Sequence, residues 1–127
     1  MASLLVLATA PAAERAERVV NLEYPRLAAQ AGLAGEVRLS CVVSGQGEVM
    51  GAKAVSGPPL LAAAAIENVR LWRFERNSAK TREVGVVYRF QLNGICAQSV
   101  CPTVFIFDAP NIATVETKPP HWQPLKR

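Results

Sequence analysis

The chain has 127 residues and a formal net charge of +4, and its length suits a single domain. Half of the residues are hydrophobic but only 6% are aromatic, so aliphatic side chains must fill most of the core. The basic residues are dispersed among apolar and acidic neighbours, which argues against nucleic-acid binding because that function needs positive charge gathered on one face.

Residues 1–13 resemble the end of a secretory signal sequence. A short apolar run is followed by small residues that offer Ala-x-Ala cleavage sites. The run is far below the roughly 20 apolar residues of a membrane span, so we expect no transmembrane segment in this chain. An exported, periplasmic or cell-envelope protein is therefore expected, and a plain apolar tail is the alternative.

Residues 14–23 are predicted to form a connector, and a domain is predicted at residues 24–93. Residues 14–23 are charged and carry no clear periodicity. Pro25 suits the first turn of a short helix, and Gly32 suits its end. Residues 36–43 alternate apolar and polar side chains, a pattern typical of a half-buried strand.

A hairpin and an amphipathic helix are predicted to follow. Gly47 lies in a turn that leads to a second strand at residues 48–55, because glycine tolerates the backbone angles of tight turns. Residues 56–59, Ser-Gly-Pro-Pro, then open a helix. Its apolar stripe has a spacing of three or four residues and consists of Leu61, Ala65, Val69 and Trp72.

The clearest strand covers residues 84–92, and a C-terminal extension follows at residues 94–127. In the strand, one face is apolar and predicted to meet the core: Val84, Val86, Tyr88, Phe90 and Leu92. The extension contains two further strand candidates, residues 103–107 and 112–117, and ends in a Pro-rich tail. This order predicts an α+β fold, in which two helices pack on one face of an antiparallel sheet of three or more strands, with an added C-terminal strand or hairpin.

The sequence holds no recognisable catalytic or metal-binding set. The one histidine, His121, lies in the Pro-rich tail without a supporting motif. Together with Cys96 and Cys101 it falls short of the four ligands that a zinc site needs. Cys96 and Cys101 are close enough in sequence for a disulfide, whereas Cys41 lies in a strand pattern and is expected to be buried. We therefore expect no enzyme, no metal and no cofactor.

Several short motifs, in this order, resemble the C-terminal domain family of the energy transducer TonB. They are Tyr24-Pro25, Gly35-Glu36-Val37, Gly47-Glu48-Val49, Ser56-Gly57-Pro58 and Trp72-Arg73-Phe74, with the alternating strand that ends near Phe90. The resemblance covers about residues 24–93. It assigns structural roles to Tyr24, Pro25, Gly35, Gly47, Trp72 and Phe74. The chain departs from the family at Arg76, where members often carry proline.

The resemblance implies a non-enzymatic periplasmic module for energy-coupled transport. Such a module binds an extended peptide, the TonB box of an outer-membrane receptor, as an added strand. The implied partner-binding residues are Val84, Val86, Val87, Tyr88, Arg89, Phe90 and Gln91. In the family, a glutamine after the Tyr-Pro pair contacts the receptor. The equivalent position in this chain is Ala29, and the adjacent Gln30 is the candidate for this contact. Because the membrane helix and long spacer of a full transducer are not seen, we expect a stand-alone relative, and a homodimer stays possible.

The alternative is a structural or assembly protein that covers its own sheet edge. In that interpretation residues 103–107 or 112–117 pair with the strand at 84–92 and occupy the family's binding site. Covering an exposed edge is a common protection against aggregation.

Overall fold

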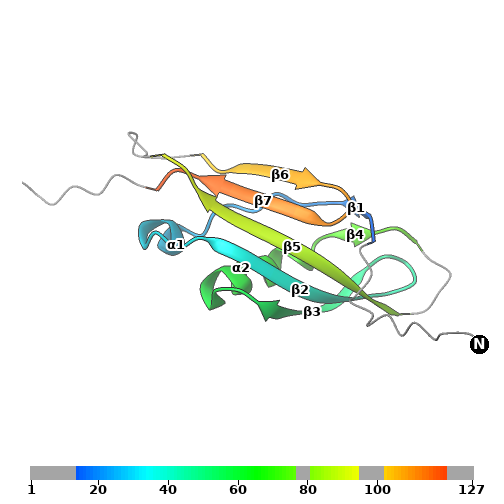
Figure 1. Cartoon of the computed structure of the whole chain (residues 1–127). Coiled ribbons are helices and arrows are strands. Elements are labelled where there is room, and N and C mark those ends of the chain that lie inside the picture. Colours follow the sequence, from blue (N-terminus) through cyan, green and yellow to red (C-terminus); the bar gives the residue numbers. More distant parts are fainter. Residues whose placement is uncertain (1–13, 77–80, 95–101, 120–127) are drawn as a thin grey trace, which may run out of the picture.

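The computed structural model describes residues 14–76, 81–94 and 102–119, which form an α+β fold with two helices, as predicted (Figure 1). The elements are β1 (Ala16–Arg18), α1 (Arg26–Gln30), β2 (Gly35–Val43), β3 (Val49–Ser56), α2 (Pro59–Val69), β4 (Arg73–Phe74), β5 (Arg82–Leu92), β6 (Val104–Asp108) and β7 (Ile112–Thr117). Five strands form one sheet in the order β3-β2-β5-β7-β6, and β1 pairs with β4 in a separate ribbon.

The sheet is mostly antiparallel, but one of its pairs is parallel. Strand β2 pairs antiparallel with both β3 and β5, and β6 pairs antiparallel with β7. Strand β7 runs parallel to β5. The predicted antiparallel sheet corresponds to β3-β2-β5, and the predicted C-terminal hairpin extends it through this parallel pair. The pair is parallel because the chain passes from β5 out to β6 and returns through β7, which inserts between them.

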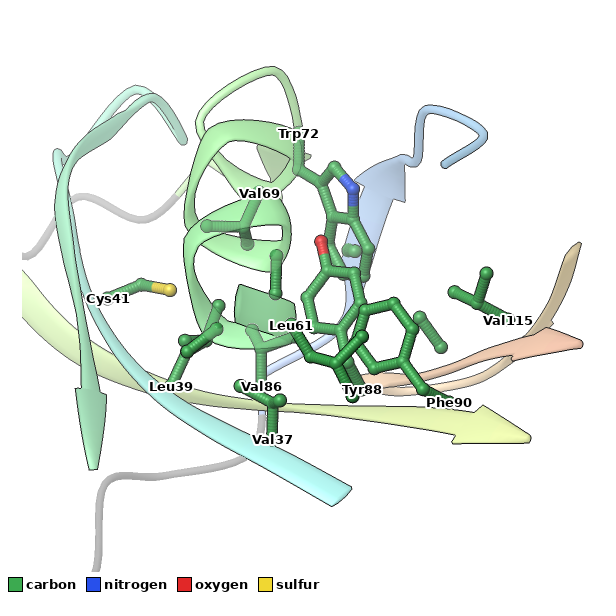
Figure 2. Close-up of a cluster of buried hydrophobic side chains, with 14 of the residues drawn as sticks. Val37, Leu39, Cys41, Leu61, Val69, Trp72, Val86, Tyr88, Phe90 and Val115 are labelled. Carbon is green, nitrogen blue, oxygen red and sulfur yellow. The ribbon is translucent and has the colours of Figure 1, made fainter. Parts of the chain in front are cut away.

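The core lies on one face of this sheet, because the strands alternate as the sequence predicted. The inward side chains of β2, β5 and β7 are buried together with those of both helices. Figure 2 shows Leu39, Val86 and Tyr88 facing the side chains of α2. Aromatic contacts extend this core, and the rings of Tyr24 and Phe90 meet edge to face at 5.5 Å. The sequence predicted a mainly aliphatic core, but most of the few aromatic side chains are gathered in it. Its largest buried members are Trp72, Tyr88, Phe74 and Phe90.

Helix α2 begins where its prolines allow and buries the predicted stripe. Pro58 is extended and Pro59 occupies the first turn, where its missing N–H costs no hydrogen bond. Leu61, Ala65 and Val69 are fully buried against the sheet. The small side chain of Ala65 lets the helix approach the strands closely.

Position 47 requires glycine for two reasons, the turn and the close contact with the backbone of Phe74. Its φ is 90°, a conformation that side-chain-bearing residues rarely adopt. A methyl group placed on it would lie 2.0 Å from the carbonyl oxygen of Phe74. The Phe74 amide in turn donates to the Gly47 carbonyl at 2.8 Å. The missing side chain therefore lets β4 dock on the hairpin turn, which places Phe74 in the core.

Residues 14–23, predicted as a connector, contribute an ordered strand. Strand β1 pairs with β4, and its Ala16 amide donates to the Pro110 carbonyl at 3.2 Å. Glu14 contacts the guanidinium of Arg82. The sequence did not indicate this strand, because three residues are too few to show a period of two. The signal-like segment 1–13, the candidate disulfide pair and His121 lie outside the described residues.

Within the described ranges, neither helix is long and apolar enough to cross a membrane.

Candidate functional site

The side chains that the sequence assigned to partner binding on β5 divide between its two faces. Val84, Val86, Tyr88 and Phe90 point into the core and are at most 2% exposed. Val87, Arg89 and Gln91 lie on the opposite face, where Arg89 and Gln91 are exposed. Gln30 is exposed on α1. The inward set stabilises the fold, so only the outward set and the backbone of β5 are suited to contact a partner.

The backbone of β5 is paired on both sides from Val87 to Phe90, and on one side over the rest of the strand. Strand β2 pairs with all of it except its last two residues, and β7 pairs with it from Val87 to Leu92. The Val87 amide donates to the Asn111 carbonyl and the Asn93 amide to the Thr117 carbonyl, both at 3.1 Å. The Asn111 side chain also donates to the Gly85 carbonyl at 2.7 Å. The edge that the family resemblance assigns to a peptide is thus occupied by the chain itself from Val87 to Leu92.

The hairpin β6–β7 is held by the core and by the N-terminal segment. Ala113 and Val115 of β7 are fully buried. The ring of Phe107 meets Trp72 edge to face at 5.6 Å. At the start of β6, the Tyr24 amide donates to the Thr103 hydroxyl at 3.1 Å. The extension is therefore part of the same folded unit as residues 24–93.

The outer side of β6 forms an edge of the sheet. Strand β6 has no second neighbour within the described part of the chain. The Val87 and Asn93 amides bond to the carbonyls of Asn111 and Thr117, so the even-numbered residues of β7 turn their backbone groups to β6. Their partners Val104 and Ile106 therefore face β7, and the N–H and C=O of Phe105 and Phe107 point away from it. The side chains of Val104 and Ile106 are 50% and 46% exposed. This edge offers both backbone hydrogen bonds and apolar contact to an extended segment.

A buried polar cluster links α2 to β5 and to the N-terminal segment, and the sequence analysis did not detect it. The Asn68 side-chain oxygen accepts from the Trp72 indole at 2.9 Å and from the Tyr88 hydroxyl at 2.7 Å. Its amide nitrogen donates to the carbonyls of Val20 and Asn21 at 3.1 and 3.2 Å. Figure 2 shows the Tyr88 hydroxyl and the Trp72 indole nitrogen on the same side of the core. The sequence offered one indication of this cluster, because side chains four residues apart, such as Asn68 and Trp72, lie side by side on a helix.

The ionisable groups of the core are arranged for stability instead of reactivity. Burial raises the pKa of the Cys41 thiol to about 12, so the thiolate needed for nucleophilic attack is scarce at neutral pH. Burial also raises the pKa of Tyr88, with a smaller contribution from Cys41, and burial raises that of Tyr24, whose hydroxyl donates to the Leu33 carbonyl. In the described residues no group of three His, Cys, Asp or Glu side chains is placed to hold a metal ion.

Comparison with protein families supports the resemblance seen in the motifs. A family model described as the C-terminal part of the Gram-negative bacterial TonB protein matches residues 20–93, more than half of the chain. The match covers β2 to β5 with both helices and ends before β6, so the hairpin that closes β5 lies outside it. A search of curated proteins gave no match. The chain belongs to the TonB C-terminal domain family.

Proposed function

We propose that this chain is a periplasmic protein-interaction module that binds an extended segment of an outer-membrane transporter, in energy-coupled transport. The family to which it belongs is a non-enzymatic protein-interaction domain associated with the cell envelope. Strand addition is the binding mode, because a sheet edge supplies backbone donors and acceptors to any extended partner. The partner's side chains then contribute only a secondary selectivity.

The position of the added strand is the free edge of β6 instead of β5. The observation that carries this proposal is the pairing of β7 with β5 over Val87–Leu92. That pairing leaves β6 as the outer strand on this side of the sheet. The outward backbone groups of Phe105 and Phe107 replace those that β5 would offer.

The energetics favour addition to β6 over displacement of β7. Displacement would expose the fully buried Val115, which costs about 1.5–3 kcal/mol. It would also separate Phe107 from Trp72, an aromatic pair worth about 0.5–1.5 kcal/mol beyond its buried area. The binding free energy of a peptide that displaces β7 is therefore less favourable by roughly 2–4.5 kcal/mol than that of a peptide that adds to β6. This difference corresponds to a factor of about 30 to 2,000 in affinity.

The test is an NMR titration of the isotope-labelled chain with a synthetic TonB-box peptide. We expect the backbone amides of Phe105 and Phe107 to shift, while those of β5 stay unchanged. Lysine at Ile106 should weaken binding about fivefold, because a charge on an edge strand opposes pairing. Thr114→Lys is the matched control, since Thr114 pairs with Ile106 on the same face but on an interior strand. Shifts confined to β5 and β7 would overturn the position at β6.

A second candidate is a structural or assembly protein of the envelope without a transducing role. The same β5–β7 pairing favours it, because the family's binding edge is closed in this chain. A titration in which no amide of β5 or β6 responds to the peptide would support this candidate over the first.

A further inference from the structure

An open pocket of about 560 Å³ lies where the C-terminal end of α2 meets β1, β4 and the turn before β3. Its volume falls in the range of small-ligand and peptide side-chain sites. Two of the elements that line it, β1 and β4, form a ribbon separate from the five-stranded sheet that ends in β6. Nothing in the proposed strand addition uses it.

The walls of this pocket are strongly basic. Three exposed arginines line it: Arg18 on β1, Arg70 at the end of α2 and Arg73 on β4. Arg18 and Arg73 stand directly opposite each other in the β1–β4 pair. Like charges in that position destabilise a strand pair, and an anion near both would offset part of this repulsion. The arrangement therefore favours a bound negative group.

The one acidic residue of the pocket compensates only part of this charge. Glu48 contacts the guanidinium of Arg73 at 3.3 Å. Within the described residues, the ion pairs include neither Arg18 nor Arg70. The three arginines and Glu48 together carry a net charge of +2 around a pocket that is open to solvent.

Apolar side chains are interleaved with the arginines. Leu71 is 60% exposed between Arg70 and the buried Trp72. Val20 follows Arg18 by two residues and lines the same pocket. A compact anion such as phosphate would use the arginines alone and leave these apolar contacts unmatched. Stacking of a nucleic-acid base is disfavoured because Trp72 is only 1% exposed.

We propose that this pocket binds an acidic peptide segment in which apolar side chains stand between carboxylates. The carboxylates would accept hydrogen bonds from Arg18 and Arg70, where guanidinium groups give strong charge-assisted contacts. The apolar side chain between them would rest on Leu71 and Val20. This inference stands apart from strand addition at β6 and does not require it.

The test is fluorescence anisotropy with a labelled peptide of alternating glutamate and leucine, titrated with the full chain. We expect binding that weakens as salt is added, because exposed charges are screened. The double variant R18Q/R70Q should lose about tenfold in affinity. The same peptide with glutamine in place of glutamate should not bind measurably.

Matched controls separate a site from general charge attraction. The double variant R26Q/K53Q removes the same charge from two exposed positions away from the pocket and should change affinity less than about twofold. Equal losses in both double variants, or no binding by the unmodified chain, would overturn the proposal. Inorganic phosphate or phosphatidylglycerol vesicles that bind with the same dependence on Arg18 and Arg70 would overturn the peptide assignment. Ile106→Lys should leave the affinity for this peptide unchanged. A failure of the pocket proposal can therefore be told apart from a failure of strand addition at β6.

Discussion

Replacement of Asn68 by leucine tests whether the buried polar cluster holds the fold together. Leucine has nearly the same size but neither accepts nor donates. The substitution leaves the Trp72 indole N–H and the Tyr88 hydroxyl without their acceptor. Those side chains are 1% and 0% exposed, so water cannot replace the lost oxygen without a change in packing.

The expected loss of stability follows from these two orphaned donors. Each buried donor without a partner costs about 1–3 kcal/mol. The carbonyls of Val20 and Asn21 lose their donor too, but they belong to a less buried segment and can be hydrated. Burial of the leucine methyl groups returns part of the cost. We expect Asn68→Leu to lower the free energy of unfolding by about 2–4 kcal/mol.

Urea denaturation followed by tryptophan fluorescence measures this loss, and a double-mutant cycle identifies its origin. Tyr88→Phe alone should cost about 0.5–1.5 kcal/mol. In the Asn68→Leu background, the same change removes an unsatisfied hydroxyl and should be nearly neutral. The two substitutions should therefore couple by about 1 kcal/mol. A loss below about 1 kcal/mol for Asn68→Leu, or strict additivity, would refute the reasoning.

Three further predictions concern stability. Gly47→Ala should destabilise the fold by about 2–4 kcal/mol through its overlap with the Phe74 carbonyl, whereas Gly51→Ala, which meets nothing within 4 Å, should stay within about 0.5 kcal/mol in the same urea assay. Val115→Ala should cost about 1.5–3 kcal/mol if β7 is part of the core, and an unchanged urea midpoint would contradict that. The Cys41 pKa rises from 9.0 unfolded to about 12 folded, so its contribution to stability is complete below pH 9 and is lost as pH rises towards 12. Cys41→Val should flatten the alkaline part of the stability curve, and an unchanged slope there would argue against burial of the thiol.

Local patterns were sufficient for most elements of the fold. The alternation along β5 and β2 follows directly from one buried and one solvated face. The prolines before α2 fixed its start, whereas the stripe extended to Trp72, three residues beyond the end of the helix at Val69. Tyr24, Trp72 and Phe74, named as structural from the family motifs, are all buried. These features depend on residues close in sequence, which is why sequence reasoning found them.

Long-range features could not be read in the same way. Residues 112–117 were recognised as strand-forming, and the alternative interpretation paired either them or residues 103–107 with the strand at 84–92, but composition does not decide between the two or give the direction of the strand. The parallel alignment of residues 112–117 with β5 depends on the position of β6 in the sheet, because β7 lies between β5 and β6. The pocket arginines, Arg18, Arg70 and Arg73, come from three elements that meet only in the fold. The candidate sites therefore depend on tertiary contacts more than on local sequence.

The insertion of β7 between β5 and β6 also has a consequence for the order of synthesis. A ribosome delivers the N-terminal part first, and β5 ends at Leu92 while β7 begins only at Ile112. The strands and helices of the family domain are thus complete while the β7-facing edge of β5 still lacks its partner. For that interval the nascent chain presents an unpaired edge at Val87–Leu92. Pairing of β7 with β5 then covers this edge late in synthesis and moves the outer edge of the sheet to β6.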